Sequence, residues 1–260
     1  FTQHEKPEAM AEIIEQSHPS VIAIGVYIWN RQLVEALVPL LRTACPNVPI
    51  VLGGPEISYD THSALAASAT CVVCGEADVS FHTIYEQILA GQAVPSVIPP
   101  AMPDLDKIAL PYSEYSGQDL ASRVLYVETS RGCVYGCEFC TSSIHPGIRR
   151  FPLERLIPEF SRLLERGAMR FKLVDRCFNL SPDHASAVLD FFLARWKPGM
   201  CLHLEMTADR ITPALRERLL RFPKGGLHIE AGIQTFSPEV ARRVGRQTDL
   251  EAAAEGIRFL

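Results

Sequence analysis

The sequence predicts an α/β protein with two domains, each built on a parallel sheet whose strands are separated by helices. Three observations support this fold class. Short apolar segments alternate with amphipathic segments of helical period along the whole chain. A proline-rich stretch interrupts the alternation between residues 95 and 111. The 260 residues are 47% hydrophobic and 21% charged, a composition that excludes long disorder and supplies substantial cores.

Residues 1–98 form the first predicted domain. The apolar run SVIAIGVY at 20–27 predicts a strand buried on both faces. Further strands are predicted at 49–54, which ends in Gly53 and Gly54, and at 70–74, and helices at 7–16, 31–44, 60–68 and 78–90. This spacing of strands and helices predicts a flavodoxin-like, Rossmann-type parallel sheet.

Residues 99–120, rich in proline, predict an extended linker, and residues 121–260 form the second predicted domain. Its strands are expected at 124–130, 170–175, 200–207 and 227–234, and its helices at 153–166, 182–195, 213–220 and 238–244. Four such units predict part of a (β/α) barrel. The chain starts without Met and ends within a helical pattern, so we expect a first strand and further barrel strands to lie outside it.

The net charge, the apolar stretches and the spacing of the cysteines exclude several classes of partner and location. A net charge of -5 gives no positive field for nucleic acid, so no nucleic-acid partner is expected. The longest apolar stretch, 21–29, is too short to cross a bilayer, and no signal-peptide pattern opens the chain. Three of the eight cysteines lie within 133–140 and the others are dispersed, which is not a disulfide framework. We therefore expect a reducing, cytoplasmic location.

The sharpest signal is the segment TSRGCVYGCEFCTS at 129–142, which directly follows a predicted strand. It spaces Cys133, Cys137 and Cys140 as C-x3-C-x2-C. Three thiolates at this spacing can ligate three irons of a [4Fe-4S] cubane and leave the fourth iron open, while neighbouring glycines let the backbone approach the sulfides. The alternative is a Cys3His zinc site that includes His145. Zinc loops seldom follow a barrel strand, which favours the cluster.

This motif, with Phe139 before its last cysteine, resembles the radical S-adenosylmethionine (SAM) superfamily. The resemblance implies a TIM-like radical SAM barrel, a [4Fe-4S] cluster, SAM bound at the open iron, and a 5′-deoxyadenosyl radical that abstracts hydrogen from the substrate. It also implies an electron donor, either a reductase or a flavodoxin or ferredoxin. Cofactor contacts would come from Phe139, Asp175, Glu205 and Gln234.

Two of the three strand-end residues have a structural alternative. By the resemblance, Asp175 would contact the amino group of SAM. Glu205 and Gln234 could instead cap helices or bond to loop backbone, which is the commoner fate of a polar residue at a strand end. Cys177 and Cys201 are expected to be small core residues.

Two turns of the first domain, VLGGPEISY at 51–59 and CGEAD at 74–78, follow strands at the edge where α/β sheets bind ligands. Together with the linker and the cysteine loop, they resemble the cobalamin-binding subclass of radical SAM enzymes. The resemblance implies a cobalamin pocket lined by Tyr27, Trp29, Gly53, Gly54 and Glu76. Alternatively, the aromatic residues pack the domains together and the Gly-Gly pair makes a tight turn.

The sequence does not identify a lower axial ligand for cobalt, and two explanations stay open: many radical SAM relatives lack the histidine, and the first strand with its loop is expected to precede residue 1. Asp60-Thr61-His62 lacks the glycine of the cobalamin histidine motif and follows a later strand than that motif does. The resemblance implies methylation of an unactivated carbon in a small-molecule or peptide substrate. Cyclisation or rearrangement with the same cofactors, and a non-catalytic sensor that binds the cluster or cobalamin, are the alternatives.

Overall fold

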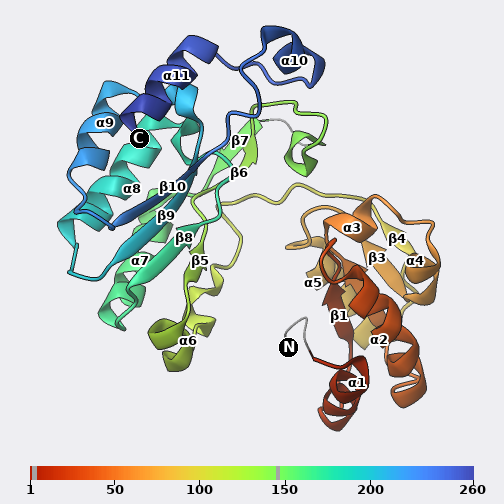
Figure 1. Ribbon diagram of the computed structural model, residues 1–260. Helices are drawn as coiled ribbons and strands as arrows, with labels where there is room; N and C mark the ends of the chain where they lie inside the picture. Colours follow the sequence, from red (N-terminus) through yellow and green to blue (C-terminus); the bar gives the residue numbers. More distant parts are fainter. Residues whose placement is uncertain (2–4, 145–146) are drawn as a thin grey trace. The chain divides into compact units, whose positions relative to one another are not determined.

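The computed structural model describes residue 1, residues 5–144 and residues 147–260 (Figure 1). The chain divides into two compact units, Phe1–Asp104 and Leu105–Leu260. Residues 105–120, for which the sequence predicts a linker, belong instead to the second unit, where Leu105, Tyr112 and Leu120 are buried in the core. Proline excludes a long helix here but does not prevent the short helices η1 (Pro111–Glu114) and α6 (Gly117–Ser122).

The first unit is a four-stranded parallel sheet in the order β1-β2-β3-β4. Its strands are β1 (Ile22–Gly25), β2 (Ile50–Gly53), β3 (Cys71–Val73) and β4 (Val97–Ile98). Its helices are α1 (Pro7–Gln16), α2 (Arg31–Ala44), α3 (Pro55–Ser58), α4 (Ala64–Ser68) and α5 (Ser80–Leu89). Helices α1, α2 and α4 pack on one face, and α5 packs on the other. The predicted Rossmann-type arrangement is confirmed.

Strand β1 corrects one prediction. Ile22 is buried, but Ala23 and Gly25 are exposed, so this strand is not covered on both faces. The reason is its place at the sheet edge, since α5 packs over β2 and β3. An apolar run alone cannot distinguish an edge strand from a central one.

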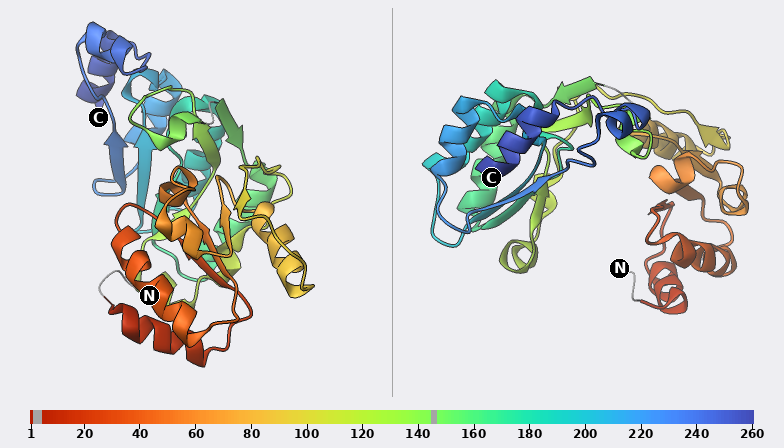
Figure 2. Two further views of the ribbon diagram at one scale, coloured as in Figure 1. Left: turned by 90° about the vertical axis from the view of Figure 1, so that its right-hand side faces the viewer. Right: turned by 45° about the horizontal axis from the view of Figure 1, so that its top comes forward.

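The second unit is a four-stranded parallel sheet in the order β10-β9-β8-β5 with helices against one face (Figures 1 and 2). Its strands are β5 (Leu125–Val127), β8 (Arg170–Leu173), β9 (Cys201–Met206) and β10 (Leu227–Ala231). Its longer helices are α7 (Leu153–Glu165), α8 (Pro182–Ala194), α9 (Pro213–Leu220), α10 (Pro238–Arg243) and α11 (Leu250–Phe259). This arrangement is the predicted partial (β/α) barrel.

The two faces of this sheet differ in chemistry because successive side chains on a strand point to opposite sides. Leu202, Leu204 and Met206 are buried among the aromatic side chains of α7 and α8, such as Phe160 and Phe192. The other face carries charged side chains from neighbouring strands: Lys172 Nζ lies 3.3 Å from Glu205 Oε1 and 3.5 Å from Glu230 Oε1. A polar face therefore leads to the carboxyl ends of the strands.

The cysteine segment contains a hairpin that the sequence does not predict. Strands β6 (Ser130–Cys133) and β7 (Gly147–Arg150) pair antiparallel, with Cys133 opposite Gly147. The segment between them includes the short helix η2 (Thr141–Ile144). No helix in the described ranges has both the length and the apolarity needed to span a bilayer.

Candidate functional site

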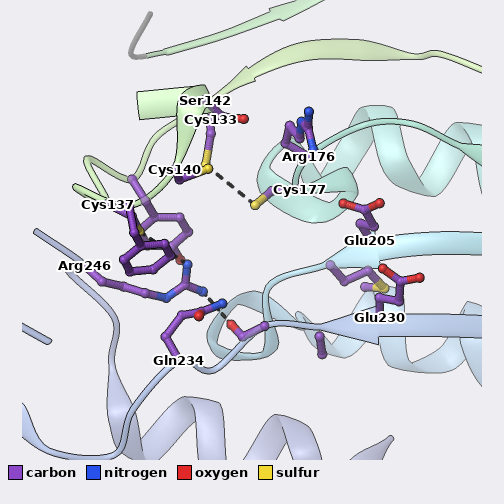
Figure 3. Close-up of a pocket in the computed structure, with 15 residues that line it drawn as sticks. Cys133, Cys137, Cys140, Ser142, Arg176, Cys177, Glu205, Glu230, Gln234 and Arg246 are labelled. Atoms are coloured by element: carbon purple, nitrogen blue, oxygen red, sulfur yellow. Dashed lines mark hydrogen bonds between the residues drawn. The ribbon is translucent and has the colours of Figure 1, made fainter. Parts of the chain in front are cut away.

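A cavity of about 450 Å³ lies at the carboxyl ends of β9 and β10 (Figure 3). All three motif cysteines line it, together with Phe139, Glu205 and Gln234 from the sequence prediction. Nine further lining residues are not among the predicted site residues, and they include Tyr135, Cys177, Glu230 and Arg246. The structure therefore brings the cysteine loop, with Phe139, and two of the three predicted strand-end residues to one cavity.

A local turn holds the second half of the cysteine motif. Cys133 ends β6 and is buried, as is Cys137, whereas Cys140 is half-buried. The Cys140 amide donates a 2.9 Å hydrogen bond to the Cys137 carbonyl oxygen, which forms a tight turn. None of the eight cysteines, all of which lie in the described residues, forms a disulfide.

The three motif thiols line one cavity, as the ligands of a multinuclear group would. Within the described ranges, no three histidine, cysteine, aspartate or glutamate side chains converge closely enough to hold one metal ion. His145 of the zinc alternative lies outside these ranges. Three thiols around one cavity can instead reach three corners of a cubane, which is larger than one ion.

Arg246 is a second feature of the cavity, besides the thiols, that suits an anionic group. Its side chain is only 9% exposed, and its Nη2 donates a 2.6 Å hydrogen bond to the Gly232 carbonyl oxygen. Nη1 lies 3.8 Å from Cys137 Sγ, and the guanidinium lies 4.4 Å from the centroid of the Tyr135 ring. Nε is buried without a partner among the described residues. A buried cation beside a thiol and with an unused donor is suited to an anionic group, such as a thiolate-ligated cluster.

The cysteine loop packs closely on the segment after α10. Glu138 N donates a 3.1 Å hydrogen bond to the Val244 carbonyl oxygen. A Cβ atom on Gly245 would lie 2.4 Å from the Gly136 carbonyl oxygen, and Gly245 has φ +71°. Only glycine allows this approach of two backbones without strain. The shape of the loop therefore depends on residues more than a hundred positions later in the chain.

Tyr135 fixes the loop to the end of β9. Its hydroxyl lies 3.0 Å from Thr207 Oγ1 and donates a 3.0 Å hydrogen bond to Asp209 Oδ1. Burial raises the pKa of this phenol, which keeps it a donor. The sequence could have indicated Tyr135 as a site residue, because it lies within the cysteine motif, two residues after Cys133.

Cys177 lies against the first motif cysteine. Its Sγ is 3.8 Å from Cys133 Sγ, and both side chains are buried (Figure 3). The contact with Cys133 and burial raise the pKa of Cys177, and the same contact lowers the pKa of Cys133. The sequence predicts Cys177 as a core residue; it is buried, but it lines the cavity.

Asp175 does not line the cavity, and its expected contact with SAM stays a prediction. The side chain is fully buried, and its oxygens accept hydrogen bonds from Thr129 N (2.9 Å), Thr129 Oγ1 (2.6 Å) and Ser130 Oγ (2.5 Å). Burial raises the pKa of the carboxyl, and these hydrogen bonds oppose the rise. Asp175 thus joins the end of β8 to the start of β6.

The remaining predicted barrel residues face the cavity. Glu205 pairs with Lys172 rather than capping a helix. Gln234 adopts φ +71°, a conformation unusual for a residue other than glycine, just beyond the end of β10. Phe139 is largely exposed at the rim.

In the first unit, Tyr27 and Trp29 follow β1 and stack with ring centroids 4.6 Å apart. Trp29 is 66% exposed. Asn30 holds this turn, because its Oδ1 accepts a 2.7 Å hydrogen bond from Tyr27 N and its Nδ2 donates to the Gly25 carbonyl oxygen. The pair thus forms a flat apolar surface at the carboxyl end of the sheet.

The glycines expected to admit a cofactor have different roles. A Cβ on Gly54, which has φ +96°, would lie 2.6 Å from the Val26 carbonyl oxygen, so the chain itself requires this glycine. A Cβ on Gly53 would make an ordinary 3.5 Å contact with the Val73 carbonyl oxygen. The tight-turn alternative therefore accounts for Gly54. Glu76 is half-buried in the turn after β3.

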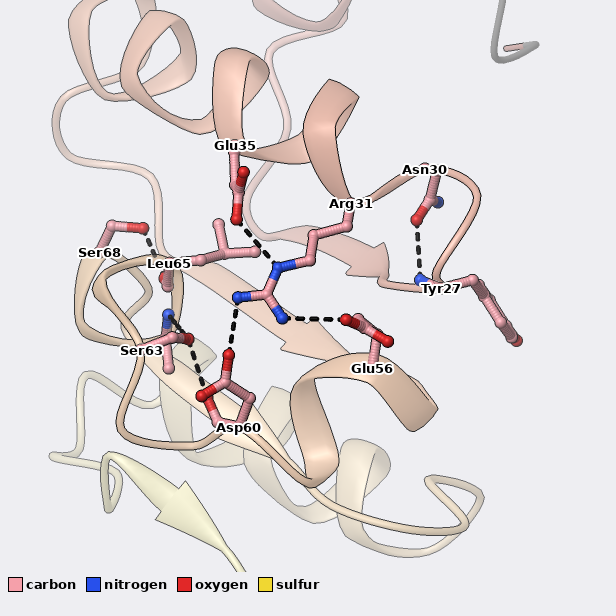
Figure 4. Close-up of polar contacts among 10 residues, drawn as sticks. Tyr27, Asn30, Arg31, Glu35, Glu56, Asp60, Ser63, Leu65 and Ser68 are labelled. Atoms are coloured by element: carbon pink, nitrogen blue, oxygen red, sulfur yellow. Dashed lines mark hydrogen bonds and ion pairs between the residues drawn. The ribbon is translucent and has the colours of Figure 1, made fainter. Parts of the chain in front are cut away.

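Arg31 ties the neighbouring turns together (Figure 4). Its guanidinium lies 2.9 Å from Glu35, 2.9 Å from Glu56 and 2.6 Å from Asp60, and these hydrogen bonds raise its pKa. Asp60, the aspartate of the imperfect histidine motif, thus has a structural partner.

Comparison with known proteins decides the family. Residues 127–260, which contain the cysteine hairpin and the barrel sheet, match the model described as radical SAM superfamily. The chain belongs to the radical SAM superfamily. Residues 1–84 match the model described as B12 binding domain, and the predicted cobalamin-binding subclass is confirmed.

Two curated proteins illustrate what the chain is similar to. The chain is 24% identical over 278 residues to an uncharacterized methyltransferase, PH0819, of Pyrococcus horikoshii, covering 96% of this chain and 59% of that protein. It is 25% identical over 197 residues to the cobalamin-dependent radical SAM methyltransferase TokK of Streptomyces tokunonensis, covering 63% of this chain and 28% of that protein.

A solved structure shares the fold. The radical SAM methyltransferase TsrM from Kitasatospora setae, with cobalamin and a [4Fe-4S] cluster bound, matches with a TM-score of 0.70 at 14% identity, covering 99% of this chain and 57% of that one. Its complex with tryptophan and a SAM analogue matches with a TM-score of 0.71 at 16% identity, covering 97% and 56%. The chain spans between about a quarter and three fifths of the length of these relatives.

Proposed function

We propose that this chain contains the cobalamin-binding and cluster-binding parts of a cobalamin-dependent radical SAM enzyme that methylates an unactivated carbon. The observation that carries the proposal is the cavity where Cys133, Cys137 and Cys140 meet, in a chain whose first unit matches a B12 binding domain. The names of TokK and TsrM support methylation as the reaction. The tryptophan in the TsrM complex supports a small molecule, of amino-acid or peptide kind, as the substrate.

The bound groups would supply a nucleophilic cobalt that carries the methyl group and a reducible cluster that cleaves SAM to a radical. The residues of the chain hold and shield these groups. Cys133, Cys137 and Cys140 would ligate three irons, and Arg246 would offset the negative charge of the cluster. Glu205 and Gln234 would contact SAM from the ends of β9 and β10, and Phe139 would cover the rim.

The cobalamin pocket is proposed at the carboxyl end of the first sheet. The stacked Tyr27 and Trp29 offer an exposed planar surface, and Gly53 and Glu76 lie at the ends of the next two strands. Gly54 shapes the turn beside them. The free thiols suit a reducing cytoplasm, where a flavodoxin or ferredoxin would supply the electron.

Reconstitution tests the proposal. The protein is purified without oxygen and supplied with iron, sulfide and hydroxocobalamin, and iron, sulfide and corrin are then measured. We expect close to four irons and one corrin per chain. With SAM and dithionite, we expect 5′-deoxyadenosine and S-adenosylhomocysteine, which a non-catalytic sensor would not form.

Alanine at each motif cysteine should abolish cluster assembly because each removes one iron ligand. The control is Cys201→Ala, since Cys201 lies at the other end of β9 and does not line the cavity. A colourless wild-type protein that holds zinc would refute the cluster, and a protein with the cluster but no corrin would refute methylation.

A further inference from the structure

We propose that Cys177 tunes the cluster: its thiol donates an S–H···S hydrogen bond to the thiolate of Cys133 and thereby raises the reduction potential of the cluster. The inference rests on the proposed function, because it requires Cys133 to ligate iron. Cys177 is a positioning residue in this account, since it acts through Cys133 and does not itself bind iron.

Geometry supports a hydrogen bond between the two sulfurs. Cys133 Sγ and Cys177 Sγ are 3.8 Å apart, within range for a sulfur hydrogen bond, although 44 residues separate them in the chain. Cys133 ends β6, and Cys177 immediately precedes η3 (Phe178–Leu180), where the chain leaves the carboxyl end of β8. Both side chains are buried in one small cluster with Tyr135 and Cys137. The contact therefore joins two buried parts of the fold that are distant in the chain.

The direction of the bond follows from the chemistry of a ligand. An iron-bound cysteine is a thiolate and has no proton to donate, so only Cys177 can be the donor. Two thiolates on different irons of one cubane are separated by the cluster and cannot lie in hydrogen-bond contact. The observed separation therefore favours Cys177 as a neighbour of a ligand, not as a fourth ligand.

A second donor approaches the same cluster of thiols independently. Arg246 Nη1 lies 3.8 Å from Cys137 Sγ, and the Arg246 side chain comes from the segment after α10. Two of the three motif sulfurs thus have a donor supplied by another part of the barrel. Because these contacts are buried, the surrounding medium screens them weakly.

Such donors change the redox equilibrium in a known sense. Reduction adds negative charge to the cluster and its thiolates, and a hydrogen bond to a ligand sulfur stabilises that charge. Loss of the Cys177 thiol should therefore make the cluster harder to reduce. Serine at this position keeps an O–H donor and should retain part of the effect.

The test compares Cys177→Ala, Cys177→Ser and the matched control Cys201→Ala with the wild-type full-length protein. Each protein is reconstituted, its iron and sulfide are counted, and the midpoint potential is measured by a redox titration followed by EPR without SAM. We expect Cys177→Ala to lower the equilibrium constant for reduction about tenfold, which is about 59 mV for a one-electron couple. Cys201→Ala should match the wild type, and Cys177→Ser should lie between.

Three outcomes would overturn the inference. The first leaves the proposed function intact, whereas the other two make Cys177 an iron ligand and would remove the open iron that SAM needs. The first is a Cys177→Ala midpoint equal to that of the wild type. The second is loss of iron in Cys177→Ala with normal iron in Cys201→Ala, which would make Cys177 a ligand. The third is that SAM changes the EPR signal of Cys177→Ala but not that of the wild type. Cys177 would then be the ligand of the fourth iron in the wild type. Absence of a cluster in the wild type would overturn both proposals.

Discussion

At the residue scale, several side chains shape the site without entering it. Both carboxyl oxygens of Asp175 accept hydrogen bonds from Thr129 and Ser130, at the start of the strand that ends in Cys133. Gly245 allows its backbone to lie against Gly136 in the cysteine loop. These residues set where the thiols lie, and their substitution should affect both stability and cluster binding.

Asp175→Asn should lower the free energy of unfolding by about 1–3 kcal/mol, the cost of a buried group left without a suitable partner. If the amide oxygen keeps the two hydroxyl donors, its NH2 group must face Thr129 N–H, which is also a donor. Urea unfolding would measure the change. Asp183→Asn, at an exposed position in the first turn of α8, is the control and should cost less than about 1 kcal/mol. Equal effects of the two substitutions would contradict this role for Asp175.

Gly245→Ala tests the contact between the cysteine loop and the segment after α10. Alanine at φ +71° costs about 1–2 kcal/mol from the backbone alone. The clash of its Cβ with the Gly136 carbonyl should add about 1–3 kcal/mol and reduce the iron content after reconstitution.

Gly225→Ala is the matched control for this substitution. Gly225 has φ +79°, but its Cβ would meet no atom within 4 Å, so only the backbone cost applies. The urea unfolding free energy and the iron content are compared for the two variants. If Gly245→Ala binds iron normally and is as stable as Gly225→Ala, the loop does not need this contact.

Residue-level prediction from the sequence succeeds where local spacing carries the chemistry. The three cysteines belong to one loop, so their shared cavity could be expected from the motif. The sequence also places Asp175 at a strand end, but that position alone does not show which way its side chain points. Cys177 and Arg246 reach the cavity from distant segments, and only tertiary packing reveals them.

At the scale of elements, periodicity locates the helices and most strands. Helices α1, α2 and α9 have the predicted bounds, because each has a regular apolar stripe or a proline at its start. The hairpin of β6 and β7 was missed, since its strands contain one isoleucine among glycine, serine, arginine and cysteine and have no alternating apolar pattern. Strand β4 has only two residues, too few for a pattern.

At Gly256 in helix α11, packing decides whether alanine raises or lowers the stability of the protein. In an exposed helix, Gly256→Ala would stabilise by about 1 kcal/mol through helix propensity. Here a Cβ on Gly256 would lie 2.0 Å from the Ala208 carbonyl oxygen in η4 (Ala208–Arg210). We expect a net loss of about 1–2 kcal/mol and a lower Tm, because overpacking costs more than propensity provides.

Ala254→Gly, on a half-buried side of α11, reports helix propensity alone and should cost about 1 kcal/mol. Thermal unfolding of both variants gives the comparison. A higher Tm for Gly256→Ala than for the wild type would show that α11 does not pack closely on η4.

At the scale of the whole molecule, the chain consists of two units that each have their own core. The sequence predicts two domains because a proline-rich stretch interrupts the helix and strand pattern. It places the end of the linker too late, because buried residues such as Leu105 and Tyr112 occur singly in a segment without periodicity. Isolated anchors of this kind leave no pattern in the sequence.

Limited proteolysis tests this organisation. A protease of low specificity should first cut between Ile98 and Leu105, where Pro99, Pro100, Ala101 and Met102 are all exposed. Mass spectrometry should find two resistant fragments that begin or end within this segment. First cuts inside β5 or between η1 and α6, where the chain is anchored by Leu120 and Tyr112, would contradict the observed boundary.

The contact between Gly136 and Gly245 also has a consequence for how the protein is made. The ribosome synthesises the thiols about a hundred residues before the segment that supports their loop, a delay of roughly 5–20 s. During that interval the nascent chain has the thiols but lacks Gly245 and Arg246. The cluster can therefore be inserted into its complete site only after the barrel segment with Gly245 and Arg246 has been translated.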